Sequence, residues 1–254
     1  MIQKVSDPSS LAPLFAGWQE TILWSCLQGV MGEVYAPAGE GPTAALATLG
    51  DFTFLAGQPQ GELAAFVPPG RSPAFHLLVP QNEGWCRCIE TLYGPRARRI
   101  TRYATHKDSQ AFDRRRLTQL AASLPPGYAL RAIDETGYHQ CRQAGWSRDL
   151  VSQFPTPEAY AALALGFGVF RGDRLLAGAS TYARYREGIE IEVDTHPDHR
   201  RQGLATGAAA ALILACLDCG LYPSWDAHNT ISLSLAQKLG YRFSHPYPAY
   251  ELSQ

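Results

Sequence analysis

The sequence predicts an α+β fold in which a mixed β-sheet is flanked by helices, with a smaller N-terminal α/β subdomain before it. In the C-terminal half, three expected strands are followed by helix, strand, helix and strand, an order typical of a mixed sheet covered by helices. The run Leu124-Pro125-Pro126-Gly127 forces a turn, because its first proline disfavours helix before it. We therefore expect a domain boundary there, between residues 1–125 and 126–254.

The N-terminal subdomain is expected to combine helices with short strands. Apolar residues recur at helical spacing from Ser9 to Gly29, which predicts one helix there. Gly50-Asp51 has the chemistry of a hairpin turn between two strands. The other predictions are strands at 32–36, 43–49, 52–56, 76–79 and 100–104, and helices at 84–92 and 112–120.

The C-terminal domain carries a more regular pattern, with a tight turn at Arg171-Gly172-Asp173-Arg174 between two of its strands. Two α+β halves of similar size are also compatible with an ancient duplication. The predicted strands are 128–133, 167–171, 174–185, 188–195, 221–227 and 242–252, and the predicted helices are 134–141, 155–162, 203–219 and 230–239.

Composition limits the classes of partner. Of the 254 residues, 46% are hydrophobic and 18% are charged, a balance typical of a globular protein. The formal net charge is −1, from 22 basic and 23 acidic residues, so nucleic acid is not the expected partner. The first residues lack the pattern of a secretory signal, and no apolar run has membrane-spanning length. We expect a cytoplasmic protein without membrane contact.

The cysteines do not indicate a metal site. Cys86 and Cys88 form a Cys-x-Cys pair, and Cys216 and Cys219 form a Cys-x-x-Cys pair inside a predicted helix. No second Cys/His pair lies at zinc-finger spacing, and residues three apart on an apolar helix share one face. We interpret both pairs as packing residues and expect no bound metal.

The segment that carries the chemistry joins a predicted strand to an Ala-rich helix and runs from Val193 to Thr206. The first N–H groups of a helix lack acceptors within the helix and, with the helix dipole, they attract anions. Gly203 and Ala205 let the backbone approach a phosphate closely, and Arg200 and Arg201 add positive charge. The residues predict a pyrophosphate site, although an ordinary strand-to-helix turn with solvated arginines would have the same local sequence.

The run Arg200-Arg201-Gln202-Gly203-Leu204-Ala205 resembles the Arg/Gln-x-x-Gly-x-Gly/Ala signature of the GNAT superfamily of N-acetyltransferases. Pro197 stands three residues before Arg200, a spacing common in that family, and Leu239-Gly240-Tyr241 resembles its closing turn. This resemblance covers residues 163–252. More loosely, the whole chain resembles a subfamily of similar length in which an N-terminal α/β region precedes the GNAT domain.

The resemblance implies the GNAT fold, with its splayed sheet, and acetyl-CoA as co-substrate. Backbone groups of Val193 and Thr195 would pair with the pantetheine arm, and Asn229 would hydrogen-bond the pantetheine or its vicinity. Asn229 is equally well placed to cap the helix that begins at Thr230. The pyrophosphate would be held by backbone N–H groups, with two arginines near the phosphates; these residues are Arg200, Arg201, Gln202, Gly203, Leu204, Ala205 and Thr206.

Transfer by attack of an amine on the thioester requires a neutral amine and therefore a base. Glu190, Glu192 and Asp194 alternate with apolar residues, so all three carboxylates share one strand face. Mutual repulsion and partial burial would raise at least one carboxyl pKa. Glu192 is our first candidate for the catalytic base and Glu190 the second. The alternative is a solvent-facing acidic strip on an antiparallel edge.

The general acid is less clear, because many family members carry a tyrosine seven residues after the asparagine, where this chain has Ala236. Ser232, Ser234, Tyr241 or a water could substitute, and the modest basicity of a thiolate makes an acid less necessary. Two functions stay open: an active N-acetyltransferase, or an acyl-CoA-binding sensor or interaction module that has lost catalysis.

The acceptor is expected to be a small-molecule amine, and the acidic strip favours a cationic one. Amino acids, aminoglycoside-like compounds and protein amines are alternatives. The N-terminal half either provides part of the acceptor pocket or forms a dimerisation surface, which leaves a homodimer open.

Overall fold

The computed structural model describes all residues except 40, 71–75 and 253–254. The chain forms two compact units. Unit 1 comprises Met1–Arg102 together with Pro246–Gln254, and unit 2 comprises Tyr103–His245.

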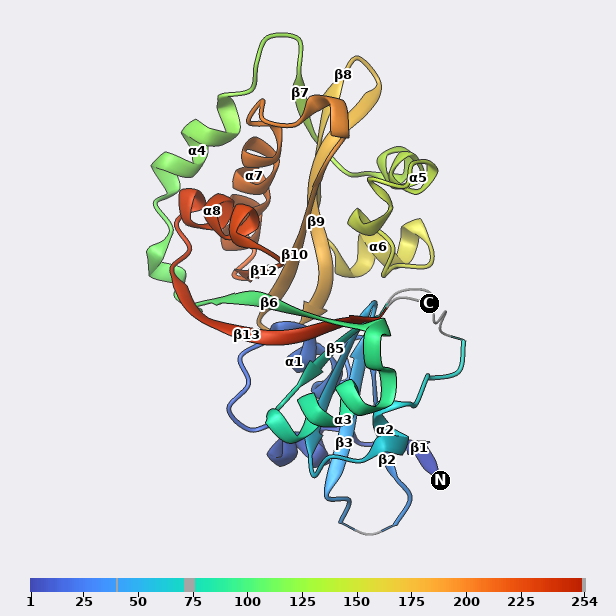
Figure 1. Ribbon diagram of the computed structural model, residues 1–254. Helices are drawn as coiled ribbons and strands as arrows, with labels where there is room; N and C mark the ends of the chain where they lie inside the picture. The colour runs from blue at the N-terminus through green and yellow to red at the C-terminus, as the bar shows by residue number, and fades with distance from the viewer. Residues whose placement is uncertain (40, 71–75, 253–254) are drawn as a thin grey trace. The chain divides into compact units, whose positions relative to one another are not determined.

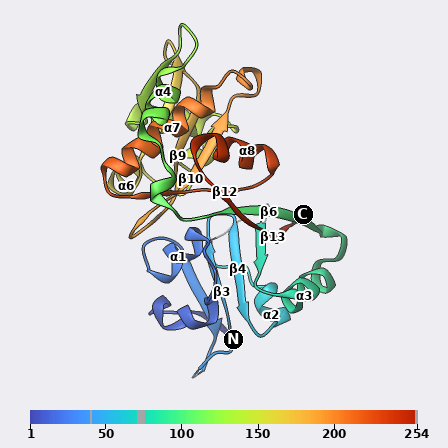
Figure 2. The same cartoon turned by 90° about the vertical axis from the view of Figure 1, so that its left-hand side faces the viewer.

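Unit 1 is built on a sheet with the strand order β1-β2-β3-β4-β5-β13-β6. Strands β2, β3 and β4 pair in antiparallel fashion, whereas β4 and β5 are parallel. Helix α1 covers one face of the sheet, and α2 and α3 cover the other (Figure 2). The elements are β1 Ile2–Lys4, the 3₁₀ helix η1 Pro8–Phe15, α1 Thr21–Leu27, β2 Glu33–Pro37, β3 Ala44–Leu49, β4 Phe52–Gly57, α2 Gly61–Ala64, β5 His76–Pro80, α3 Glu83–Tyr93, the 3₁₀ helix η2 Gly94–Arg96 and β6 Ala97–Thr105.

The single helix predicted from Ser9 to Gly29 is wrong, because the chain forms η1, a turn at Ala16 and Gly17, and then α1. Pro13 lies inside η1, where it has no backbone N–H to donate, and Gly17 has a left-handed φ of 89° that interrupts helical structure. Both segments nevertheless bury the apolar faces that the spacing predicts, with Phe15 and Leu23 almost fully buried. The periodicity therefore identified the buried side chains correctly but could not resolve the break.

Unit 2 contains a sheet with the order β11-β10-β9-β8-β7. Helices α4, α7 and α8 lie on one side of this sheet, and α5 and α6 lie on the other (Figure 1). The elements are the 3₁₀ helix η3 Ser109–Ala111, α4 Arg114–Ala122, β7 Ala129–Ala132, α5 Glu135–Gln143, the 3₁₀ helix η4 Arg148–Leu150, α6 Pro157–Leu163, β8 Gly166–Arg171, β9 Arg174–Tyr185, β10 Gly188–Thr195, the 3₁₀ helix η5 Pro197–His199, α7 Leu204–Asp218, β11 Tyr222–Ser224, β12 Asp226–Ala227, α8 Thr230–Leu239 and β13 Phe243–Leu252.

The units meet in the chain at Arg102 and Tyr103, whereas the sequence suggests a boundary at residues 125 and 126. Helix α4, which precedes the Pro-Pro-Gly turn, packs on α7 inside unit 2. The approach is close: a Cβ atom on Gly207 of α7 would lie 2.8 Å from Cδ2 of Leu124. The proline turn therefore redirects the chain within unit 2, and the C-terminal end of β13 returns to unit 1.

The interpretation of the cysteines as packing residues holds for Cys86 and Cys216, which are buried, whereas Cys219 is exposed at the end of α7. Cys88 is half-buried. Among the helices of the described residues, none combines the length and apolar character needed to cross a membrane.

Candidate active site

The central feature of unit 2 is the point at which β10 and β11 separate. Strand β10 pairs with β9 along its whole length, but its parallel pairing with β11 covers Gly188–Glu190. The strand that follows, β12, pairs with β6 instead, with Asp226 opposite Ala104. Within the described residues, one edge of β10 is therefore open from Glu192 to Thr195, as the resemblance implied for a splayed sheet.

The backbone N–H groups of Val193 and Thr195 point to this open edge. The N–H of His196 donates to the carbonyl of Leu176 on β9 at 2.8 Å, and hydrogen-bonded positions alternate along an antiparallel pair. The Val193 N–H donates to Oε1 of Glu192 at 3.2 Å, and the Thr195 N–H donates to Oδ1 of Asp194 at 3.2 Å. Each of these two N–H groups is thus held by a carboxylate of the preceding residue, which a ligand carbonyl can replace.

The three carboxylates of β10 share one face of the sheet, as the alternation predicts. Ile189 and Ile191 belong to the buried cluster that includes α7, and Val193 packs against it. Since successive side chains of a strand point to opposite faces, Glu190, Glu192 and Asp194 lie on the other face. That is the face covered by α5 and α6 (Figure 1).

These carboxylates differ in their surroundings. Glu190 is only 3% exposed, and its Oε1 accepts the Asp226 N–H at 2.7 Å. Ser224 lies opposite Glu190 in the strand register, and its buried hydroxyl finds no partner among the described residues. Glu192 is half-buried. We call the point after Glu190 and Ser224, where β10 and the chain leading to β12 separate, the fork. Both side chains are polar although they are buried.

Asp194 is the carboxylate whose titration is most clearly altered. Burial raises its pKa to about 6, the nearby Asp149 charge adds to the rise, and the Thr195 N–H and Arg200 oppose it. Burial likewise raises the pKa of Tyr222 to about 12, with the Glu190 charge contributing. Burial thus raises one carboxyl pKa on this strand face, as expected, whereas the like charge that adds to the rise is that of Asp149 and not of a second β10 carboxylate.

Beyond Thr195 the chain turns into α7 through two residues with left-handed backbones, Arg201 with φ 61° and Gly203 with φ 80°. Gly203 occupies the N-cap position and has no side chain that could bond the N–H groups of the first turn. A Cβ atom built on Gly203 would have no described atom within 4 Å, so the space beside it is open. Arg200 and Arg201 are exposed beside this turn.

Gln202 is held by a side chain that sequence reasoning missed. The Tyr128 hydroxyl donates to Oε1 of Gln202 at 2.9 Å and lies 3.0 Å from Nδ1 of His199. Tyr128 directly follows the Pro-Pro-Gly turn and is 74 residues from Gln202 in the sequence. No local pattern signals that pairing, because it depends on how β7 is placed next to β8.

Asn229 is the N-cap of α8, and its Oδ1 accepts the Ser232 N–H at 2.9 Å. The capping role that the sequence allowed is therefore present, and contact with pantetheine stays a prediction. The hydroxyl of Ser232 accepts the indole N–H of Trp225 at 3.1 Å. Asn229 and Trp225 together fix the start of α8 beside the fork.

The residues considered as general acids, and Ala236 at the usual acid position, differ in burial and in hydrogen bonding. Ala236 is fully buried in the core of unit 2. Tyr241 is also buried, its hydroxyl donates to the Pro223 carbonyl at 2.6 Å, and burial raises its pKa well above the ordinary value. Ser234 is exposed and its hydroxyl donates to the Thr230 carbonyl. Tyr241 is thus poorly placed to release a proton.

Comparisons with known proteins agree with this geometry. The family described as GNAT acetyltransferase matches residues 12–250. A structure described as a GCN5-related N-acetyltransferase-like protein from Streptococcus suis is 46% identical, with a TM-score of 0.91 over 97% of this chain and 98% of that chain. A tandem GNAT protein from the clavulanic acid biosynthesis pathway has a TM-score of 0.55 at 11% identity, over 99% and 97% of the two chains, which shows likeness of fold alone.

A curated relative gives a more limited match. The uncharacterized N-acetyltransferase YdfB of Bacillus subtilis is 30% identical over 136 residues. The match spans 50% of this chain and 49% of that protein, so the chain corresponds to about half the length of this relative.

Proposed function

Because the chain belongs to the GNAT acetyltransferase family, we propose that it transfers the acetyl group of acetyl-CoA to a primary amine. In this reaction the amine nitrogen attacks the thioester carbonyl, the carbon–sulfur bond breaks, and CoA leaves as a thiolate that takes up a proton. The observation that carries the proposal is the open edge of β10, which is followed, after η5 and a turn, by a helix start without a capping side chain.

Acetyl-CoA would lie along this edge. The N–H groups of Val193 and Thr195 are available to the pantetheine arm once they release the carboxylates of Glu192 and Asp194. The backbone of Gln202, Gly203, Leu204, Ala205 and Thr206 would hold the pyrophosphate, because a helix start attracts anions and Gly203 leaves room for one. The exposed Arg200 and Arg201 would add charge near the phosphates.

Glu192 is the better candidate for the base that takes the amine proton, and Glu190 is the second. Glu192 is half-buried at the open edge, where an acceptor amine would meet the thioester. The Glu190 carboxylate is 3% exposed and bonds the Asp226 N–H, an arrangement that supports a role in holding the fork open. A strand face with three carboxylates favours a cationic, small-molecule amine as acceptor. A cytoplasmic location and a homodimer stay predictions.

A second function, acyl-CoA binding without transfer, is supported by one observation. The position at which many family members carry a tyrosine acid is Ala236, and its side chain is buried in the core. Tight binding of acetyl-CoA with no acetylation of any amine in a broad panel would favour this alternative.

The proposal can be tested by isothermal titration with acetyl-CoA and with CoA. Wild type should bind both in the micromolar range, and Gly203→Asp should weaken binding at least about tenfold, because a carboxylate would occupy the anion position. Gly220→Asp is a matched control: Gly220 also has a positive φ, of 69°, and open space, but it lies at the far end of α7. Failure of wild type to bind either compound would refute the proposal.

A further inference from the structure

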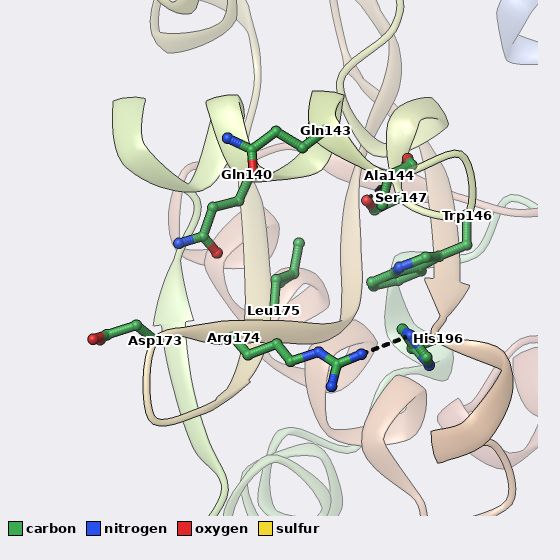
Figure 3. A pocket seen from close by; sticks show the side chains of 9 residues that line it. All are labelled: Gln140, Gln143, Ala144, Trp146, Ser147, Asp173, Arg174, Leu175 and His196. Atoms are coloured by element: carbon green, nitrogen blue, oxygen red, sulfur yellow. Dashed lines mark hydrogen bonds between the residues drawn. The ribbon is translucent and has the colours of Figure 1, made fainter.

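Unit 2 contains a cavity of about 380 Å³ that belongs to neither β10's open edge nor the start of α7. It lies beside α5, whose Gln140 and Gln143 form one wall. The first residue of β9 and the residue after β10 supply Arg174 and His196 (Figure 3). Trp146 and Leu175 complete its apolar part. Concave spaces of this size with a few converging polar groups are typical of small-molecule sites.

The polar end of the cavity has more hydrogen-bond donors than acceptors. A guanidinium nitrogen of Arg174 lies 3.0 Å from Nε2 of His196, and the backbone N–H of Asp198 lies 3.3 Å from Nδ1 of the same ring. A neutral imidazole has one donor and one acceptor nitrogen, so it cannot accept both N–H groups. An anionic oxygen that contacts both the Arg174 guanidinium and His196 Nε2 from the cavity would supply the acceptor that this arrangement lacks.

Two carboxylates lie nearby, and neither fills this role. Asp198 Oδ2 lies 3.9 Å from Nδ1 of His196, the ring nitrogen that does not face Arg174. The side chain of Asp173 points away from Arg174 and His196 (Figure 3). It is fully exposed and lies 3.8 Å from the guanidinium of Arg131. The cavity therefore keeps a positive end that is complementary to a phosphate or a carboxylate.

The rest of the cavity suits a flat organic group. The half-buried indole of Trp146 packs against the His196 ring at a centroid distance of 5.7 Å and an interplanar angle of 70°. The buried Leu175 adds an apolar surface, and the Gln140 and Gln143 amides can each donate and accept hydrogen bonds. An aromatic ring bearing an anionic group matches this combination.

The cavity is also separate from the proposed reaction centre. His196 is four residues beyond Glu192 along an extended chain, which corresponds to about 13 Å. His196 is connected to the start of α7 only through other side chains. Its ring lies 5.5 Å from the His199 ring, and the Tyr128 hydroxyl contacts both His199 and Gln202. A group bound here would be near the proposed phosphate site without occupying the position of the amine.

We propose that this cavity binds a small organic anion, a phosphate or carboxylate carried on an aromatic ring, with the charge in contact with both Arg174 and His196. The phosphate could come from a free aryl phosphate, or from the 3′-phosphate of CoA, which is attached to the ribose beside the adenine ring. The site itself does not depend on the proposed transferase activity.

Phenyl phosphate is a suitable probe, with phenol as its uncharged counterpart, and binding can be followed by ligand-observed NMR and calorimetry. Wild type should bind phenyl phosphate and not phenol. Arg174→Gln should weaken binding at least about tenfold, equivalent to about 1.4 kcal/mol. Arg186→Gln is the matched control, since it removes the same charge from an exposed residue just beyond the other end of β9 and should leave binding unchanged. Thermal melting establishes that both variants are folded.

Competition identifies the source of the anion. If neither CoA nor 3′-dephospho-CoA displaces phenyl phosphate, the site serves a free anion. Displacement by CoA alone would assign the cavity to the 3′-phosphate of the co-substrate. Displacement by both compounds, equal binding by Arg174→Gln, or no binding to wild type would overturn the proposal.

Discussion

Unit 1 and unit 2 repeat one order of strands and pairings, yet they differ at the strand pair that forms the candidate site. In unit 1, β1 to β4 pair successively in antiparallel fashion and β4 pairs in parallel with β5. In unit 2, β7 to β10 do the same, and β10 pairs in parallel with β11. The recurrence accords with a duplication.

The parallel pair stays closed in unit 1. Phe52–Leu55 pair with Leu77–Pro80, and the ladder continues because the Gln81 N–H donates to the Leu55 carbonyl at 3.0 Å. The Gln81 side chain then accepts the Gly57 N–H at 2.8 Å and donates to the Leu14 carbonyl at 2.6 Å. The edge that is open on β10 is thus filled by protein in unit 1.

The strands β13 and β12 explain why the β4–β5 pair stays closed while the β10–β11 pair separates. Strand β13 supplies the antiparallel neighbour of β5, with Tyr250 opposite Leu78. The end of β6 instead pairs with β12, with Tyr103 opposite Ala227. The parallel pairing of β11 with β10 ends at Ser224, opposite Glu190, because the next strand, β12, pairs with β6 instead. The same order of elements therefore gives a site in one unit and a closed sheet in the other, since a fold by itself does not determine function.

The largest expected effect comes from the chemistry that β4 lacks, because Phe52–Gly57 contain no carboxylate whereas β10 carries three. Glu192→Gln should lower kcat for acetyl transfer by about 100-fold or more, the usual contribution of a general base, without changing acetyl-CoA affinity. The measurement is steady-state kinetics with mass-spectrometric detection of the acetylated amine, alongside calorimetry.

The control for this prediction is Glu62→Gln in unit 1, which neutralises an exposed carboxylate and should leave kcat unchanged. An unchanged kcat in Glu192→Gln, combined with a large loss in Glu190→Gln, would move the base to Glu190. That result would require an explanation of how an amine reaches a carboxylate that is 3% exposed.

A second prediction compares two glycines with similar backbones, Gly57 at φ 78° and Gly203 at φ 80°. A Cβ atom on Gly57 would lie 2.1 Å from the Thr43 carbonyl oxygen, whereas one on Gly203 would meet open space. Gly57→Ala should therefore lower the free energy of unfolding by about 3 kcal/mol, and Gly203→Ala by about 1 kcal/mol from backbone strain alone. Urea unfolding measures both values.

The two variants should show the opposite order in acetyl-CoA affinity: the variant that loses less stability should lose more binding. Gly203→Ala should weaken acetyl-CoA binding because the methyl group projects into the proposed phosphate space, while folded Gly57→Ala should bind as wild type does. Equal stability losses in the two variants would contradict the difference in crowding between the two turns.

The elements of both units could be predicted from the sequence, including β3, β4 and the Gly50-Asp51 turn in unit 1, but the site could be predicted in unit 2 alone. Alternation along Gly188–Thr195 identified the strand and its acidic face, and the Gly203 turn marked the helix start. Both signals are local, since side-chain period and left-handed backbone preference depend on neighbouring residues.

The remaining features depend on contacts between distant residues. Tyr128 with Gln202, Gln81 with Leu14, and the Arg174–His196 pair each join segments whose separation in sequence gives no hint of contact. The paired order of the strands is likewise set by which edge finds a partner. The predicted strand 221–227 shows this, because it divides into β11 and β12 where the partner changes.

The smallest predicted effect concerns Asp194, which lies on the open edge of unit 2. Its pKa is raised by burial to about 6 from an ordinary value of 3.8, so the unfolded chain loses this proton at lower pH than the folded chain. This group therefore favours the folded state most below pH 4, and its contribution falls as pH rises from about 4 to 6. Above pH 6 the carboxylate is ionised in both states, and the free-energy penalty of burying its charge is constant.

Asp194→Asn removes that penalty because an amide does not ionise. The variant should be more stable than wild type at pH 7 by the order of 1 kcal/mol, and about equal to it at pH 4, in urea unfolding at the two pH values. Asp173→Asn, whose side chain is fully exposed, should show no such pH dependence. A stability gain of Asp194→Asn that is the same at both pH values would mean that the residue acts through packing, and the open edge would then impose no electrostatic cost on unit 2.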